Sequence, residues 1–159
     1  RLGLGRSFDA VTCLYDSLNY LLQPSELKET FRGVALHLEM GGIFLFDLAT
    51  EFALAREWGN SVEVVSAPDL FQVWRSRYEE EKKTATLELT FFQREKGDSF
   101  RKIEEVHQHR AISPEEVTES LREAGFRLEG AYACFTQEPP LADTYRTVYV
   151  ARRAIQVGK

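Results

Sequence analysis

The residues best suited to chemistry lie in a polar turn between two apolar segments. Asp16 and Asn19 follow the apolar segment 8–14, and a helical segment leads from them to a second apolar strand that ends at Asp47. A strand, a helix and a second strand in this order predict a βαβ unit. Because the carboxyl ends of strands in an open parallel sheet face the ligand crevice, we expect residues 14–20 to border a binding site.

A second polar group occupies alternate positions of a later segment, at Glu105, His107 and His109. Residues two apart on a strand share a face, so this trio could in principle bind zinc. The chain has no H-E-x-x-H pattern and no cysteine partner near them, so we expect a polar sheet face and no metal. A further hypothesis is that His107 or Arg110 reaches a substrate across the crevice, because histidine can act as a base near neutral pH.

The elements that would position these residues begin with a helix opened by Pro24 and Ser25. Its apolar side chains recur at spacings of three and four up to Leu38, which indicates one buried face. We expect this helix to end at Gly41-Gly42 and the second strand to run over 43–47. The first strand, residues 8–14, has the composition of a parallel strand buried on both faces.

The pattern then changes to the period of two that is typical of strands. From Phe71 to Arg110 it divides into three segments, so we expect a three-stranded antiparallel insert at about residues 62–111. Ser113-Pro114-Glu115-Glu116 predicts a capped helix that ends at Gly125. Two closing strands follow at about 128–136 and 144–152.

The bulk composition narrows the class of protein. The chain has 159 residues, 43% of them apolar, which predicts a single domain with a real core. Its net charge of −5 argues against a nucleic-acid partner. No apolar run reaches the roughly 20 residues that span a bilayer, so we expect no membrane partner. Cys13 and Cys134 lack C-x-x-C spacing, which fits a cytoplasmic protein. Since Met40 is the only methionine and Arg1 is the first residue, we expect the C-terminal part of a longer protein.

Four motifs, in this order and spacing, carry a resemblance to a known family. They are Phe8-Asp9-Ala10-Val11-Thr12-Cys13 followed by Asp16-Ser17-Leu18-Asn19-Tyr20-Leu21, then 38–47, then Glu105-x-His107-x-x-Arg110, and Glu123-Ala124-Gly125-Phe126. The chain resembles the C-terminal two-thirds of a class I S-adenosylmethionine-dependent methyltransferase. It is most similar to small bacterial members with an antiparallel insert that act on small molecules or amino sugars. The resemblance implies an α/β fold, with a mostly parallel Rossmann-like sheet whose N-terminal strands are absent, in one partial domain over residues 1–159.

The resemblance also implies a cofactor, S-adenosyl-L-methionine, and roles for particular residues. Cys13, Leu14, Tyr15 and Asp16 would lie near the methionine part of the cofactor, and Asp16, Asn19 and Tyr20 would border the pocket of a small-molecule acceptor. On the separate hypothesis given above, His107 would be the catalytic base and Arg110 would contact that acceptor. Methyl transfer requires mainly in-line placement and desolvation, because the sulfonium is already activated. The enzyme would therefore be a methyltransferase that acts by direct displacement.

Other interpretations remain open from the residues alone. Asp16 could bond its own backbone in the turn, and Tyr15 and Tyr20 could be core aromatics. The chain could be a cofactor-free remnant that acts as a structural or protein-binding module, or a fragment of a nicotinamide-dependent Rossmann enzyme. A sheet without its first strands would leave an unpaired edge, which predicts a possible homodimer.

Overall fold

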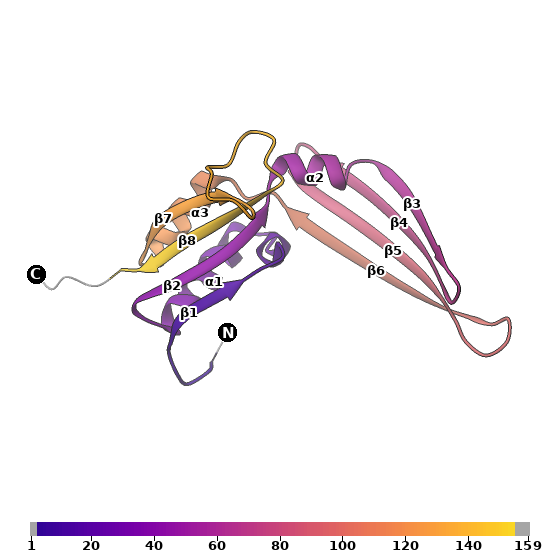
Figure 1. The fold of residues 1–159 in the computed structure, drawn as a ribbon, viewed down its shortest axis with the longest axis horizontal. Helices are drawn as coiled ribbons and strands as arrows, with labels where there is room; N and C mark the ends of the chain where they lie inside the picture. The colour runs from indigo at the N-terminus through magenta and orange to yellow at the C-terminus, as the bar shows by residue number, and fades with distance from the viewer. Residues whose placement is uncertain (1–2, 155–159) are drawn as a thin grey trace, which may run out of the picture.

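The computed structural model describes residues 3–154 and contains two four-stranded sheets that extend in different directions from a junction near α2 (Figure 1). The first sheet has the strand order β1-β2-β8-β7 and the second has the order β3-β4-β5-β6. The elements are β1 (Phe8–Cys13), η1 (Ser17–Tyr20), α1 (Pro24–Leu36), β2 (Leu38–Ala49), α2 (Glu51–Glu57), β3 (Ser61–Ala67), β4 (Leu70–Glu79), β5 (Thr84–Arg94), β6 (Phe100–Arg110), α3 (Pro114–Glu123), β7 (Phe126–Ala133) and β8 (Arg146–Arg153).

The first sheet is mixed, which corrects the expectation of a mostly parallel sheet. Strand β1 pairs with β2 in parallel, whereas β8 is antiparallel to both of its neighbours, β2 and β7. The reason is the connection between the last two strands: β8 follows β7 through a loop over residues 134–145 without a helical crossover. Such a connection returns the chain antiparallel to the strand it leaves. The α/β class itself is confirmed.

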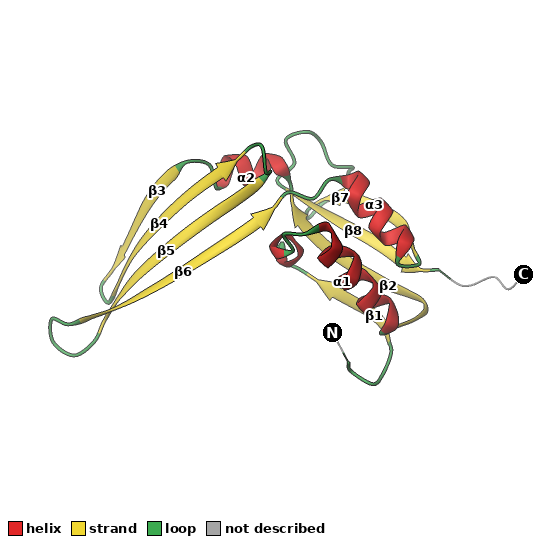
Figure 2. Ribbon diagram, turned by 180° about the vertical axis from the view of Figure 1, so that it is seen from behind, coloured by secondary structure: helices red, strands yellow, loops and turns green. Residues whose placement is uncertain are grey.

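Helices α1 and α3 cover one face of the first sheet (Figure 2). Phe31 of α1 is fully buried and lies 5.6 Å, between ring centroids, from Phe44 of β2. Phe46 stacks on Tyr149 of β8 at 5.1 Å. Val117, from the apolar face of α3, joins the same cluster. Full burial of each such side chain stabilises the fold by roughly 1.5–3 kcal/mol, so this cluster fixes the sheet on which the site is built.

Strand β1 is an edge strand of this sheet and is not buried on both faces, contrary to the sequence-based expectation. Val11 and Cys13 are half-buried against the helix-covered core, while Asp9, Ala10 and Thr12 are exposed. Among the described residues β1 has a paired neighbour on one side only, β2. The apolar composition of 8–14 therefore correctly predicts a strand, but it wrongly predicts a central strand of the sheet.

The glycine pair does not end helix α1, which is a second correction. The helix ends at Leu36, and β2 begins two residues later, at Leu38, with the glycines inside the strand. Gly41 has φ +83°, which favours glycine. A Cβ on Gly42 would lie 2.9 Å from the carbonyl oxygen of Glu39 and 3.0 Å from that of Asp9. The pair thus allows β2 to approach β1 closely.

The second sheet has four antiparallel strands, where the sequence analysis expected three. The additional strand is β3, which pairs with β4 over its whole length, from Ser61 opposite Ser76 to Ala67 opposite Leu70. Pro68 and Asp69 form a two-residue connection between β3 and β4. The sequence pattern did not indicate this hairpin, because Val64 and Val65 interrupt strict alternation.

The start of helix α3 confirms the predicted cap. The Ser113 hydroxyl accepts a hydrogen bond from the Glu116 amide at 3.2 Å, and Pro114 is the first helical residue. The carboxylate of Glu116 does not complete the reciprocal half of a capping box but binds the Arg110 guanidinium at 2.7 and 2.8 Å. The helix therefore also anchors the end of β6. Gly125, with φ +82°, follows its C-terminus as expected.

Asn19 joins the two sheets at their junction. Its side chain is fully buried and its amide nitrogen donates to the carbonyl oxygens of Ala49, at 3.0 Å, and Arg110, at 2.9 Å. Its amide oxygen accepts from the Ala49 backbone nitrogen at 3.0 Å. One side chain thus links the turn after β1 to the ends of β2 and β6.

Replacing Asn19 with leucine should lower the free energy of unfolding by about 2–4 kcal/mol, because three buried backbone groups lose their partner while the volume is nearly kept. Urea denaturation followed by circular dichroism measures this change. Asn60 is exposed, so Asn60→Leu is the matched control and should change stability by less than about 0.5 kcal/mol. Equal effects of the two substitutions would contradict the bridging role.

Candidate functional site

The candidate site lies where the carboxyl ends of β1 and β2 meet the base of the second sheet. The turn that follows β1 places Tyr15 and Asp16 in the left-handed region, with φ 60° and 50°. The Asp47 carboxylate, at the end of β2, accepts hydrogen bonds from both backbone amides, at 3.2 Å from Tyr15 and 2.6 Å from Asp16. A left-handed conformation costs a non-glycine residue roughly 1–2 kcal/mol, and charge-assisted hydrogen bonds of this kind offset that cost. Asp47 therefore holds the turn in its shape.

Arg146 of β8 completes this arrangement. Its guanidinium lies 3.2 Å from an Asp16 carboxylate oxygen and 3.6 Å from one of Asp47, and 5.8 Å from the centroid of the Tyr15 ring. Burial raises the pKa of Asp16, Arg146 opposes that rise, and the Asp47 charge adds to it. One cation thus balances two carboxylates that burial would otherwise disfavour.

A chain of three polar side chains crosses from the first part of the molecule to the second sheet. The Tyr20 hydroxyl lies 2.9 Å from Nδ1 of His107, and Nε2 of His107 lies 3.1 Å from the Glu105 carboxylate. With its proton on Nε2, the imidazole donates to Glu105 and accepts from Tyr20. Burial raises the pKa of Tyr20, and the charges of Asp16 and Glu105 raise it further, so the phenol remains protonated.

His109 lies beneath this chain and is enclosed by aromatic rings. It is 3% exposed, stacks on Trp58 at 4.2 Å and meets the edge of Tyr20 at 4.1 Å. Neither ring nitrogen has a hydrogen-bond partner, and Nδ1 lies 3.8 Å from an Asp16 carboxylate oxygen. Burial lowers the pKa of His109 to about 4, and His107 and Arg146 add to the shift. The imidazole is therefore neutral at pH 7.

The structure brings some of the predicted site residues together and gives others internal partners. Tyr20 is hydrogen-bonded to His107, and both Tyr20 and Asp16 lie beside His109. The Asn19 side chain makes its hydrogen bonds to backbone groups at the junction between the sheets. Arg110 donates from Nε to the Leu21 carbonyl oxygen at 3.2 Å and from its other two nitrogens to Glu116. The geometry thus indicates a positioning role for Asn19 and Arg110, in place of the direct substrate contact that the sequence suggested.

The remaining predicted residues lie along the start of the same turn. Cys13 is half-buried, and burial followed by the Asp47 charge raises the pKa of its thiol, so it is a thiol at neutral pH. Leu14 is 44% exposed and Tyr15 is 80% exposed. These two apolar side chains therefore offer surface at the carboxyl end of β1, where a ligand of an open sheet binds.

Three important residues of this site were not predicted from the sequence. Asp47 was noted only as the acid that ends a strand, although an acid at that position is itself a signal. Arg146 gave no signal, because its role depends on β8 lying next to β2. Trp58 gave no signal either, because its stacking on His109 depends on how α2 packs against β6. Within the described range 3–154, no group of three histidine, cysteine, aspartate or glutamate residues could hold a metal ion.

A cavity of about 200 Å³ lies on the same face of the second sheet as His107. Trp58 and Trp74 line it together with Leu87, which is paired with His107 across β5 and β6. Its other walls are Glu57, Ser61, Glu63 and Ser76. The cavity could therefore accept part of a small ligand whose reacting group reaches His107.

In residues 3–154 no helix has the length and apolar character needed to cross a bilayer.

Comparison with known proteins identifies relatives of one kind. The chain is 31% identical over 152 residues to "Putative methyltransferase YqeM" of Bacillus subtilis (strain 168), a match that covers 96% of this chain and 61% of that protein. No family model matches the sequence. The chain thus spans about three-fifths of the length of the curated relatives that it matches, which are 61% and 60% covered.

Solved structures agree with this relationship. An S-adenosylmethionine-dependent methyltransferase from Clostridium acetobutylicum ATCC 824 superposes with a TM-score of 0.86 at 26% identity, covering 98% of this chain and 62% of that one. The sugar N-methyltransferase KedS8 from Streptoalloteichus sp ATCC 53650 has the same fold, with a TM-score of 0.73 at 24% identity, covering 98% of this chain and 60% of that one.

The lowered pKa of His109 predicts a pH dependence of stability. The unfolded chain binds a proton at this residue below pH about 6.5, whereas the folded chain does so only near pH 4. Unfolding therefore takes up a proton between these values, and its free energy should fall by about 2–3 kcal/mol as the pH falls from about 6.5 to about 4. Urea denaturation at several pH values measures this loss.

The control for this prediction is His109→Phe, which keeps a ring between Trp58 and Tyr20 but cannot titrate. The difference in slope between wild type and variant isolates His109 from the carboxylates, which contribute to both curves. Superimposable pH profiles would show that the histidine is not responsible.

Proposed function

Because the chain corresponds in sequence and fold to about three-fifths of a class I S-adenosylmethionine-dependent methyltransferase, we propose that it forms part of an enzyme that transfers a methyl group from S-adenosyl-L-methionine to a small molecule. We treat residues 1–159 as one partial methyltransferase domain whose antiparallel sheet, β3 to β6, borders the acceptor side of the crevice. The proposal favours an enzyme over a cofactor-free module, and a methyl donor over a nicotinamide cofactor.

The turn after β1 fits one end of this cofactor. Leu14 and Tyr15 present apolar surface there, and Cys13 is a neutral thiol. None of these three side chains therefore carries a charge that would repel a cationic ligand. Asp16 supplies a carboxylate whose backbone is fixed by Asp47. When bound, the cofactor supplies a methyl carbon that is already activated by the adjacent sulfonium. The part of the site formed by these residues therefore has to bind and orient, and to exclude water.

The acceptor would lie between this turn and the face of the second sheet that carries His107. Tyr20 is 47% exposed and its hydroxyl is hydrogen-bonded to His107, so it can contact an acceptor and pass on a proton. When the acceptor is methylated, the proton on its nucleophilic atom would move to the Tyr20 hydroxyl oxygen while the Tyr20 proton moves to Nδ1 of His107. Glu105 holds the imidazole in the tautomer that can accept it.

One observation supports the proposal most directly: the hydrogen bond between Tyr20 and His107. It joins residues that are 87 positions apart in the chain and that the sequence analysis had assigned to the acceptor side for separate reasons. A base candidate and the turn beside the donor therefore meet at one place. The contacts of buried Asp47 with half-buried Asp16 and Arg146 hold the turn next to that place.

Asp16→Ala should weaken binding of S-adenosylhomocysteine or lower kcat roughly tenfold or more, since a charge-assisted contact is worth about 1.5–3 kcal/mol. Calorimetry on the full-length protein measures the affinity for S-adenosylhomocysteine, and steady-state kinetics on the same protein measure kcat. Asp9→Ala is the matched control, because Asp9 is an exposed acid at the amino end of the same strand. If Asp16→Ala leaves affinity and turnover at wild-type values while it folds normally, Asp16 has no part in the site.

Tyr20→Phe and His107→Gln should each lower kcat by roughly 10- to 100-fold with a smaller change in KM, because each breaks the proton relay. The double variant should lose little more than the worse single variant, since residues that act as a unit are not additive. The control is Gln108→Ala, which changes an exposed residue of β6 next to His107. Losses that multiply in the double variant would argue against a relay.

A further inference from the structure

A cavity of about 410 Å³ lies at the carboxyl end of β2, next to the loop that joins β7 to β8. The first residues of α2 and the first residues of α3 form its other walls. Small-molecule sites in proteins are cavities of roughly 300–1,000 Å³. This cavity therefore has the size of a ligand site.

The register of β2 with β8 sets this cavity apart from the charged group that holds the turn after β1. Leu48 and Thr147 line the cavity and lie opposite each other in the two strands. Asp47 and Arg146 each precede one of them by one residue, and successive residues of a strand point to opposite faces. The Asp47 carboxylate and the Arg146 guanidinium therefore lie on the other face of the sheet.

Two buried hydroxyl groups in the cavity wall have no partner. Thr147 and Tyr149 are each 4% exposed, and neither hydroxyl makes a hydrogen bond to any of residues 3–154. The hydroxyls of Thr50, Thr144 and Ser113 in the same wall each have an internal partner. Buried polar groups are normally hydrogen-bonded, so the two free hydroxyls indicate a ligand that supplies the missing partners.

Tyr149 is a hydrogen-bond donor at neutral pH. Burial raises the pKa of its phenol to about 12, and the charge of Glu115 adds to the rise. Its ring stacks on Phe46 at 5.1 Å between centroids, which fixes the direction of the hydroxyl. The Thr147 hydroxyl can donate or accept. The pair can therefore bind one polar group of a ligand from two sides.

The charged residues of the wall already have partners. The Lys83 ammonium lies 2.8 Å from the Glu51 carboxylate, and the Arg110 guanidinium lies 2.7 Å from that of Glu116. The apolar part of the wall includes Leu48, Phe52, Ile112 and Leu141. A charged ligand would have to compete with one of these ion pairs or lose its hydration without a partner, whereas an uncharged ligand would not.

The loop that borders the cavity is held in place by Thr50. The Thr50 hydroxyl donates to the Thr144 carbonyl oxygen at 2.6 Å, and the Thr50 amide donates to the Tyr145 carbonyl oxygen at 3.0 Å. The Leu141 amide in turn donates to the Thr144 hydroxyl at 2.8 Å. The wall is therefore preformed, which lowers the entropic cost of binding a ligand.

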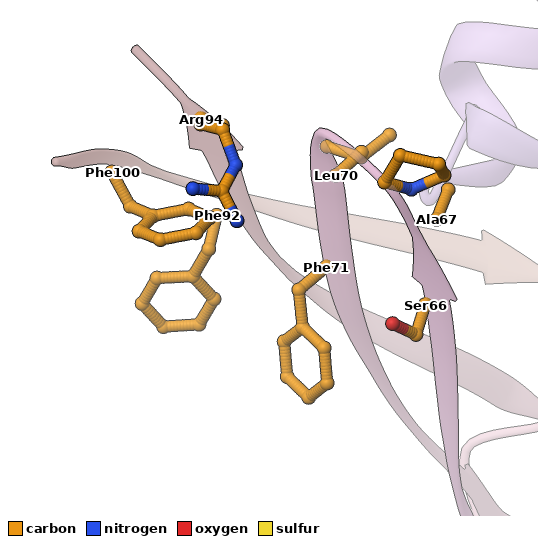
Figure 3. A pocket seen from close by; sticks show the side chains of 8 residues that line it. Ser66, Ala67, Leu70, Phe71, Phe92, Arg94 and Phe100 are labelled. Carbon is orange, nitrogen blue, oxygen red and sulfur yellow. The ribbon is translucent and has the colours of Figure 1, made fainter. Parts of the chain in front are cut away.

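A larger hollow on the second sheet lacks these features (Figure 3). It measures about 800 Å³ and is lined by Phe71, Phe92 and Phe100 with Arg94. The Arg94 guanidinium lies over the Phe100 ring, 4.8 Å from its centroid. Arg94 and Ser66, the polar residues among those that line the hollow, are both exposed. Free buried polar groups thus distinguish the smaller cavity.

We propose that the cavity at the carboxyl end of β2 binds an uncharged, mainly apolar small molecule through hydrogen bonds to Tyr149 and Thr147. The apolar walls bury the body of the ligand, and the Tyr149 phenol donates to its oxygen or nitrogen atom. The cavity shares no lining residue with the acceptor position beside Tyr20 and His107, so its occupation does not require the methyl donor.

The probe for this site is 2-naphthol, which joins a flat apolar body to one hydroxyl and is uncharged at pH 7. Its fluorescence, titrated with the full-length protein, should show saturable binding. Naphthalene lacks the hydroxyl and should bind roughly 2- to 10-fold more weakly, as measured by displacement of 2-naphthol. The charged analogue 2-naphthoate should bind at least about tenfold more weakly, because burying its carboxylate costs more.

Tyr149→Phe and Thr147→Val test the two hydroxyls with little change in shape. Each should weaken binding of 2-naphthol by roughly 2- to 10-fold and leave that of naphthalene unchanged, because only a hydrogen bond is lost. The matched control is Tyr132→Phe, since Tyr132 is a half-buried tyrosine of β7 that does not line the cavity. This variant should bind both compounds like the wild type.

Ala142→Trp tests the location, because Ala142 lines the cavity from the exposed side of the loop. It should abolish binding of 2-naphthol, whereas Ala55→Trp, at an exposed position of α2 outside the cavity, should not. Asp16→Ala should also leave this binding unchanged, which separates the cavity from the proposed cofactor site. The proposal is overturned by absence of saturable binding, by equal losses for naphthalene and 2-naphthol in Tyr149→Phe, by normal binding in Ala142→Trp, or by loss of binding in Asp16→Ala.

Discussion

The carboxylate of Asp47 is the contact on which the rest of the site depends. It takes up both backbone amides of the left-handed turn, and so it decides where Tyr15, Asp16 and the following helical turn lie. Arg146 neutralises this carboxylate and that of Asp16 together. Without that cation the buried charge of Asp47 and the half-buried charge of Asp16 would repel each other and disfavour the conformation of the turn that brings Tyr20 to His107.

The sequence predicted well those features that depend on local residue order. The strand after Ser7, the helix opened by Pro24 and the capped helix at Ser113 follow from periodicity and capping chemistry. The family resemblance, which rests on motif order, is confirmed by the relatives. Tyr20 and His107, which belong to different motifs, are hydrogen-bonded to each other. Their proposed functions in binding and catalysis stay predictions, because contacts alone do not test them.

Features that depend on the packing of distant segments could not be predicted. The place of β8 beside β2 brings Arg146 to Asp47, and no local pattern encodes that neighbour. The exposure of β1 follows from its position at the edge of the sheet, which composition does not reveal. Asn19 and Arg110 were expected at a substrate. Their side chains are instead consumed by backbone carbonyls and by Glu116, partners that become visible only once the chain is folded.

The attachment of the second sheet has a mechanical consequence. Asn19 and Glu116 both bind Arg110 at the end of β6, from the turn after β1 and from α3, whereas Phe100 begins the same strand at its other end. The sheet is thus held at one end, while its other end projects away from the junction with the first sheet (Figure 1). Bending amplitude grows with distance from the point of attachment, so bending of the free end displaces the Tyr20 and His107 side chains, which lie near the attached end, least of all.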